Sequence, residues 1–211
     1  SLRLHHSGPI DVMPLHAAVR AIATIVALED LRLCGWPIND VHAEVLAHGL
    51  PRMRTLIITK SKIGPRGVHA LGDGMRRLYY LDLRHGSEVT GEGFGVFRRL
   101  NAPLHTLVLS ACPKLDSAHL RTIACIQNLH WLDLSLSPVR PADLKDLARS
   151  GTLRKLVLRG CPGVNAAAAL QALQGVRHLH TIDLTGCLLA DEPSARRLAA
   201  AAGAAAGASS A

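Results

Sequence analysis

The sequence predicts an α/β solenoid, in which short parallel strands form a curved sheet on the concave side and helices cover the convex side. Three observations support this fold class: a strand motif that recurs at a nearly fixed interval, an apolar helical pattern after each motif, and a helix-stopping residue before the next one. The 211-residue chain is 48% hydrophobic but only 3% aromatic. A core of aliphatic side chains suits thin layers stacked in series, so the composition agrees with a repeat architecture.

The strand motif is Leu-x-x-Leu-x-Leu, with Met or Ile at a few of the Leu positions, and successive copies start 24 to 26 residues apart. A truncated copy, Leu2-x-Leu4, precedes seven full ones. Because one layer cannot bury its own apolar side, the copies must stack, and their strands must lie parallel. We expect seven short strands, each paired with the next in chain order, near Leu31, Leu56, Leu81, Leu107, Leu132, Leu156 and Ile182.

After the strand motifs comes a second pattern, in which one apolar residue is followed by two more apolar residues, five and eight positions later. Steps of three and of eight fall on one face of a helix. In the sixth copy we expect this register to be stretched by one residue, to Val164, Leu170 and Leu173. The pattern is regular in Ile63-Val68-Leu71, Val89-Phe94-Phe97, Leu115-Leu120-Ile123 and Val139-Leu144-Leu147.

Gly or Asn stands before each following strand, where a helix can end in the left-handed conformation at little cost. A glycine-rich stretch, residues 86–95, runs into the helix of the third full copy, where we expect it to allow close packing or fraying. Each unit is therefore a strand, a turn, a helix and a stop. The stop residues are Gly49, Gly74, Asn101, Asn128, Gly151 and Gly175.

Together these motifs resemble the leucine-rich-repeat family over roughly residues 2–190. Cysteine stands three positions after the last strand leucine at Cys112, Cys161 and Cys187, and Cys125 lies near a helix end. This arrangement resembles the cysteine-containing subclass of F-box-associated repeat proteins and of several assembly factors. The resemblance implies a protein-protein interaction scaffold, either a substrate adaptor or a subunit of a larger assembly, although no F-box is evident. We expect the solenoid to span residues 1–198 and an Ala/Gly/Ser-rich tail at 199–211 to be disordered.

Composition also bears on the compartment. No run of 18 apolar residues occurs, so we expect no membrane span and no membrane partner. The first residues show no basic-then-apolar leader. Five cysteines, an odd number, argue against a disulfide framework and for a reducing, intracellular compartment, with the cytoplasm favoured.

The sequence shows no constellation that points to catalysis. It contains no Gly-x-Ser-x-Gly elbow, no Walker loop and no dinucleotide-binding motif. The repeat cysteines are interpreted as buried thiols that bond to the backbone, because a zinc site would need a close Cys-x-x-Cys pair. The twelve histidines form only two close pairs, at residues 5–6 and 178–180. We therefore expect a protein that is not an enzyme and uses no metal, cofactor or small-molecule substrate.

The residues between the strand leucines face the concave side, because side chains alternate along a strand. Tyr80 and Trp131 share one strand column, two copies apart. Tyr, Trp and Arg are enriched at interface hot spots. We therefore predict a protein-binding surface made of Tyr79, Tyr80, Asp82, Arg84, His105, His130, Trp131, Asp133, Lys155 and Arg159.

The net charge of +8 is concentrated in residues 51–100, which hold 10 basic and 4 acidic residues. Cations complement helix C-termini, but this effect explains one arginine per turn rather than the pairs seen here. A strip of this charge suits an acidic protein or a phosphate backbone, so a ribonucleoprotein component that contacts RNA remains the alternative function. The strip consists of Arg52, Arg54, Arg76, Arg77, Arg98 and Arg99, which we expect to line one edge of the solenoid.

Overall fold

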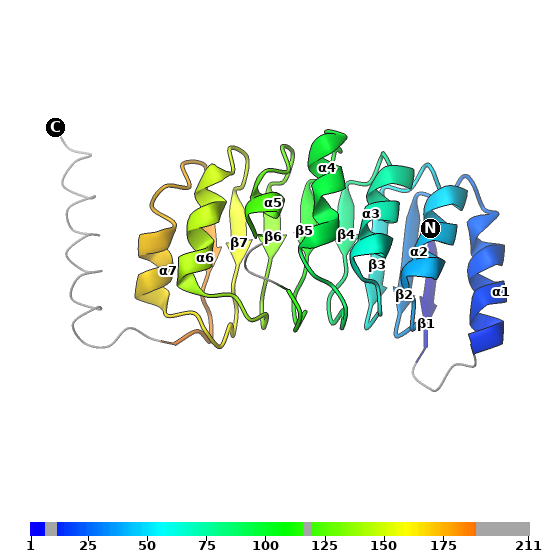
Figure 1. Cartoon of the computed structure of the whole chain (residues 1–211), viewed down its shortest axis with the longest axis horizontal. Helices are drawn as coiled ribbons and strands as arrows, with labels where there is room; N and C mark the ends of the chain where they lie inside the picture. Colours follow the sequence, from blue (N-terminus) through cyan, green and yellow to red (C-terminus); the bar gives the residue numbers. More distant parts are fainter. Residues whose placement is uncertain (7–11, 116–119, 189–211) are drawn as a thin grey trace.

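The structure, a computed structural model, describes residues 1–6, 12–115 and 120–188. Strands and helices alternate along an elongated stack, and the helices cover one face of a single sheet (Figure 1). The strands are β1 (Leu2–His5), β2 (Asp30–Cys34), β3 (Thr55–Thr59), β4 (Tyr80–Asp82), β5 (Thr106–Val108), β6 (Trp131–Asp133), β7 (Lys155–Val157) and β8 (Thr181–Asp183).

Every strand pairs in parallel with the next one in chain order, which confirms the predicted topology. The seven expected strands are all present, and the truncated first copy adds β1 as an eighth. The register aligns equivalent leucines, as in the pairing of Leu56 with Leu81 and of Leu107 with Leu132. Equivalent positions of the strand motif are therefore aligned across all eight strands.

The helices after α3 are shorter than the first three. The first three have 10 to 12 residues, whereas α4, α5 and α6 have only 4 or 5, and α7 has 7. Asn39 begins α2 with a capping box in which its side chain accepts from the amide of His42 at 3.2 Å. The helical segments are α1 (Val12–Ala23), α2 (Asp40–Gly49), α3 (Pro65–Gly74), η1 (Glu92–Phe94), α4 (Gly95–Arg99), α5 (Leu120–Ala124), α6 (Pro141–Leu144), η3 (Lys145–Arg149) and α7 (Ala166–Ala172).

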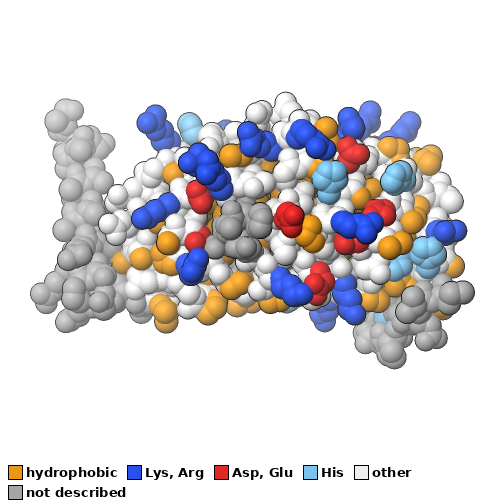
Figure 2. Space-filling model, viewed as in Figure 1, with side chains coloured by type: hydrophobic (Ala, Val, Ile, Leu, Met, Phe, Trp, Pro, Cys, Tyr) orange, Lys and Arg blue, Asp and Glu red, His pale blue; other side chains and the backbone are white. Residues whose placement is uncertain are grey.

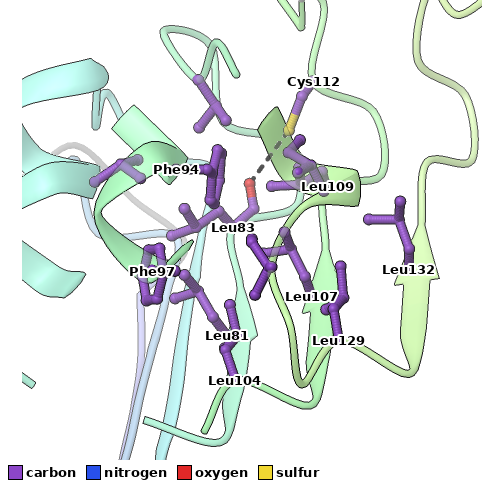
Figure 3. Packing of buried hydrophobic residues seen from close by; sticks show 14 of the residues in the cluster. Leu81, Leu83, Phe94, Phe97, Leu104, Leu107, Leu109, Cys112, Leu129 and Leu132 are labelled. Carbon is purple, nitrogen blue, oxygen red and sulfur yellow. Dashed lines mark hydrogen bonds between the residues drawn. The ribbon is translucent and has the colours of Figure 1, made fainter. Parts of the chain in front are cut away.

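The core is a continuous apolar layer between the sheet and the helices. Strand leucines such as Leu81, Leu107 and Leu132 are fully buried, and Phe94 and Phe97 fill the layer beneath α4 (Figure 3). The two phenylalanine rings lie 6.0 Å apart. They are the largest fully buried side chains of the core.

The helix stops differ from the prediction. Of the six stop residues, only Asn101 has a positive φ, of 49°. Gly49 and Gly74 instead mark close approaches, because a Cβ there would collide with the carbonyl oxygens of Ala23 and Ala47 in the preceding helices. Glycine at these helix ends therefore allows neighbouring helices to pack closely and does not supply a left-handed turn.

The left-handed residues occur at the other end of the strands. In seven successive units the residue two positions after the last strand leucine has a positive φ, between 53° and 77°. In six of them the amide of this residue donates to a carbonyl of the next unit, for example from Lys60 to Arg84 at 3.1 Å. The column consists of Gly35, Lys60, His85, Ala111, Leu136, Gly160 and Gly186.

Two further expectations concern the helices. The stretched register of the sixth copy is wrong at Leu170, which is 37% exposed, whereas Ala169 is buried at the regular position. Val164 and Leu173 are buried, as predicted. The glycine-rich stretch packs closely, as expected, since a Cβ on Gly93 would lie 2.5 Å from the carbonyl oxygen of Pro65. The predicted tail at 199–211 lies outside the described residues.

Candidate functional site

The position just before each strand forms a column along the edge of the sheet where the strands begin. The carbonyl of Arg54 accepts hydrogen bonds from the amides of both Tyr79 and Tyr80, each at 2.9 Å. The carbonyls of Tyr79 and His105 accept two amides of the next unit in the same way. These shared carbonyls hold the column at the spacing of the strands. Its members are Glu29, Arg54, Tyr79, His105, His130, Arg154 and His180.

Three rings in this column stack on one another. Tyr79 lies 4.7 Å from His105, and His105 lies 4.5 Å from His130, with interplanar angles of 14° and 8°. These distances match the spacing of neighbouring strands, about 4.8 Å, so the backbone sets the stack. Burial lowers the pKa of His105, and the nearby charges of His130 and Arg154 lower it further. Burial and these charges therefore favour the neutral form of His105.

The first strand column places Tyr80 and Trp131 two units apart, because both pair with Thr106. Trp131 is 37% exposed, and the ammonium of Lys155 lies 4.1 Å from the centroid of its ring. This is a cation-π contact. Tyr80 is half-buried, and burial together with the charge of Asp82 raises the pKa of its phenol. The two aromatic residues thus share a surface, as the sequence predicts.

Asp82 is not exposed, contrary to the sequence-based expectation. It is 1% exposed, and its carboxylate accepts from the backbone amide of Arg84 at 3.0 Å and from its guanidinium Nη2 at 2.5 Å. The sequence pattern places Asp82 on the concave face, but the longer Arg84 side chain lies over it. The hydrogen bond to Asp82 raises the pKa of Arg84. This pair fixes the end of β4 and offers a partner only the partly exposed guanidinium.

Aspartates in the same column repeat this arrangement. Asp133 accepts from the amide of Ser135 at 2.9 Å, and Asp183 accepts from the amide of Thr185 at 3.1 Å. Asp183 also binds Arg159 at 2.6 Å. Hydrogen bonds from Thr185, followed by those from Arg159, lower the pKa of Asp183 to about 2. The acidic concave residues therefore stabilise strand ends as well as facing the surface.

The six arginines do not form one uniform strip. Lys and Arg side chains project along the upper edge of the molecule in the view of Figure 2, but three of the six turn toward neighbours. Arg54 lies 3.7 Å from Glu29, Arg76 lies 3.4 Å from Asp73, and Arg99 lies 3.5 Å from His69 on the helical side. Arg52, Arg77 and Arg98 make no side-chain ion pair with other described residues. Arg54 and Arg77 line a depression together with Thr55, Tyr79 and Pro103.

The three repeat cysteines are buried, as predicted. The thiol of Cys112 donates to the carbonyl of Leu83 at 3.4 Å (Figure 3), and Cys161 and Cys187 donate to Leu134 and Leu158 in the same way. Burial raises the pKa of Cys112 and Cys161 to about 11. Among the described residues no group of three or more His, Cys, Asp or Glu side chains could hold a metal ion.

Sequence reasoning grouped Tyr79, His105 and His130 with the concave surface, whereas the structure aligns them as a separate stack on the edge of the sheet. It overlooked Pro103 and Arg154, which lie beside this stack. The sequence position of Arg154 could have revealed it, since Arg154 stands directly before its strand, as Tyr79 does. Among the described residues, no helix is both long and apolar enough to cross a membrane.

These features define the class of protein: the chain is an α/β solenoid of the leucine-rich-repeat type, with an open sheet of eight parallel strands. Its fold is similar to that of an internalin (inlF) from Listeria monocytogenes str. 4b F2365, with a TM-score of 0.55 and 15% sequence identity. The match covers 89% of this chain and 62% of the internalin chain, so this chain spans less than two thirds of that length. No protein-family model matches the sequence, and no curated protein matches it either.

Proposed function

We propose that this chain is a non-catalytic interaction module that binds a protein partner on its concave face. The observation that carries this proposal is the exposed Trp131 ring, held under Lys155 in the same strand column as Tyr80. An aromatic ring that is part exposed, oriented by a cation and supported by a rigid sheet is typical of an interface hot spot. The internalin-like fold supports an interaction role only at the level of the fold.

The charged groups around this centre give a partner polar contacts. The guanidiniums of Arg84 and Arg159 are held by Asp82 and Asp183, and both remain partly exposed. Ion pairs of this kind fix the orientation of a donor, which lowers the entropy lost when a partner binds. The surface is therefore suited to a partner that inserts an apolar side chain beside Trp131 and accepts hydrogen bonds at its flanks.

Two roles follow from the cysteine-containing pattern: the substrate-binding part of an F-box-like adaptor and a fixed subunit of a larger assembly. The buried thiols at Cys112, Cys161 and Cys187 support the resemblance that suggests these roles. All five cysteines are free, which supports an intracellular, reducing compartment such as the cytoplasm. In this proposal the chain uses no metal or cofactor and acts on no small-molecule substrate.

The experiment that tests this proposal is affinity purification with mass spectrometry, comparing the intact chain with a Tyr80→Ala/Trp131→Ala variant. Each truncation should weaken the partner's binding by about 2 kcal/mol, the threshold for a hot spot, while the fold persists. Leu170→Ala is the matched control, because Leu170 is also 37% exposed but lies on helix α7. Normal partner recovery by the folded double variant would contradict the concave site and favour the arginine edge.

A further inference from the structure

The edge stack ends at an uncovered ring face. Tyr79 is 49% exposed, and His105 stacks on one side of its ring. The equivalent residue of the preceding unit is Arg54, whose guanidinium is directed to Glu29 at 3.7 Å. Among the described residues, no ring or cation stacks on the second face of Tyr79. The stack therefore lacks a member at the place where a planar group could extend it.

The same place is hollowed and positively charged. The depression beside Tyr79 is lined by Arg54 and Thr55 of the preceding unit, by Arg77, and by Pro103 of the following unit. The side chain of Arg77 forms no ion pair with described residues, and the pair between Arg54 and Glu29 is more than half exposed on both sides. An exposed pair of this type contributes little stability, so an incoming anion can replace Glu29 at low cost.

The ligand that fits must combine a planar ring with a nearby anion. A stacked base satisfies the uncovered tyrosine face, and phosphates satisfy the two guanidiniums. Arg52 lies between α2 and β3, and Arg98 lies in the last turn of α4; neither forms an ion pair with described residues. A repeating polyanion uses such additional charges, whereas a single anionic side chain of a protein does not. The net charge of +8 also attracts a polyanion.

We propose that this depression binds one nucleotide of a single-stranded nucleic acid, with its base stacked on Tyr79 and its flanking phosphates on Arg54 and Arg77. The depression adjoins the protein-binding surface, since Thr55 pairs with Tyr80, but neither Tyr80 nor Trp131 lines it, so the proposal does not depend on the proposed function. In a duplex the bases stack on one another and cannot stack on Tyr79. Binding should therefore be selective for single strands and should weaken as salt increases.

The test uses the full chain and a short oligothymidylate that carries one 2-aminopurine, because this base loses fluorescence when it stacks. Binding at about 50 mM salt should quench the probe, and raising the salt to about 200 mM should weaken binding steeply. Tyr79→Ala should remove the quenching and weaken binding about tenfold, while Tyr79→Phe should retain both. Arg77→Gln should lower the slope of log affinity against log salt by about one.

The matched charge control is Arg121→Gln, because Arg121 is exposed on helix α5 away from the depression, and it should leave the salt slope nearly unchanged. Trp131→Ala should bind the oligonucleotide normally, which separates this site from the concave surface, because Trp131 lies two units away from Tyr80. The proposal is overturned if the chain does not bind the single strand at low salt, if Tyr79→Ala binds it as the intact chain does, or if a duplex binds equally well. It is also overturned if polyglutamate displaces the oligonucleotide completely, and equally well from Tyr79→Ala and from Tyr79→Phe. That result would assign the arginines to an acidic protein.

Discussion

In four units, a single residue with a Cβ after the strand has a strained backbone conformation that links the unit to the next one. Lys60, His85, Ala111 and Leu136 adopt positive φ values, which cost a residue with a Cβ about 1 to 2 kcal/mol. Each donates its amide to a carbonyl of the next unit. The strained conformation therefore turns a hydrogen-bond donor toward the following repeat and links neighbouring units.

Gly35 is the position of this column that tolerates substitution least. Its φ is 77°, and a Cβ there would collide with the carbonyl oxygen of His6. Gly35→Ala should lower the free energy of unfolding by more than about 2 kcal/mol, since left-handed strain and a backbone clash act together. Gly151→Ala is the control, because nothing lies within 4 Å of a Cβ at that glycine. Urea unfolding curves measure both, and equal midpoints for the two variants would contradict the prediction.

The cysteines should differ in reactivity toward thiol reagents. Burial raises the pKa of Cys112 and Cys161 to about 11, so little reactive thiolate forms near neutral pH. Cys34 and Cys125 are only partly buried, and Cys187 is buried. Mass spectrometry of the native chain treated with iodoacetamide should find Cys34 and Cys125 modified well before the other three. Rapid modification of Cys112 without unfolding would show that its side chain does not point into the layer.

At the scale of the element, strands were predicted better than helices or surface groups. Strand position and pairing follow from a leucine spacing that only one register satisfies. The burial of Asp82 could not be read from alternation, because it depends on how the Arg84 side chain folds over the strand. Likewise, Gly49 carries no sequence mark that distinguishes a left-handed stop from close helix packing. The periodicity of the sequence predicts on which side of a strand or helix a residue lies. The contacts of its side chain depend also on residues of neighbouring units.

The ring stack should make stability depend on pH. The pKa of His105 is lowered from 6.5, mainly by burial, so the unfolded chain binds more protons than the folded chain just below that value. The contribution is therefore fully present above about pH 6.5 and is lost as the pH falls toward the folded pKa. His42, which burial and His16 shift in the same direction, adds to the effect.

Chemical denaturation at several pH values tests this dependence. The free energy of unfolding should fall as the pH decreases below about 6.5, and His105→Gln should flatten the decrease. His178→Gln serves as the control, because His178 is exposed and stands outside the stack. An unchanged pH slope in the His105 variant would show that the stack does not discriminate against the charged ring.

For the whole molecule, each unit contacts mainly its neighbours, so stability varies along the stack. Leu132 and Leu134 in β6 and just after it are fully buried, whereas the equivalent Ile182 and Leu184 at β8 are only partly buried. Leu2 and Leu4 of β1 are also only partly buried. The central units are therefore covered on both sides, and the outer strands of the described sheet are covered less.

Amide hydrogen exchange should reveal this gradient. Protection should be greatest in β3 to β6 and least in β1 and β8, because outer units can open without disturbing the centre. Leu132→Ala should cost about 2 to 5 kcal/mol, and Ile182→Ala should cost less. Uniform protection across all eight strands would indicate instead that the solenoid opens as one cooperative unit.

The shared carbonyls at the strand entrances have a consequence for engineering. Because shared main-chain hydrogen bonds set the spacing of the residues from Glu29 to His180, their side chains can be changed while the backbone keeps this spacing. Equivalent positions recur along this edge at a fixed spacing, so new side chains can be introduced there one at a time. Extending the aromatic run by Arg154→Tyr, or interrupting it by His105→Ser, would lengthen or divide the stack while the backbone keeps its spacing.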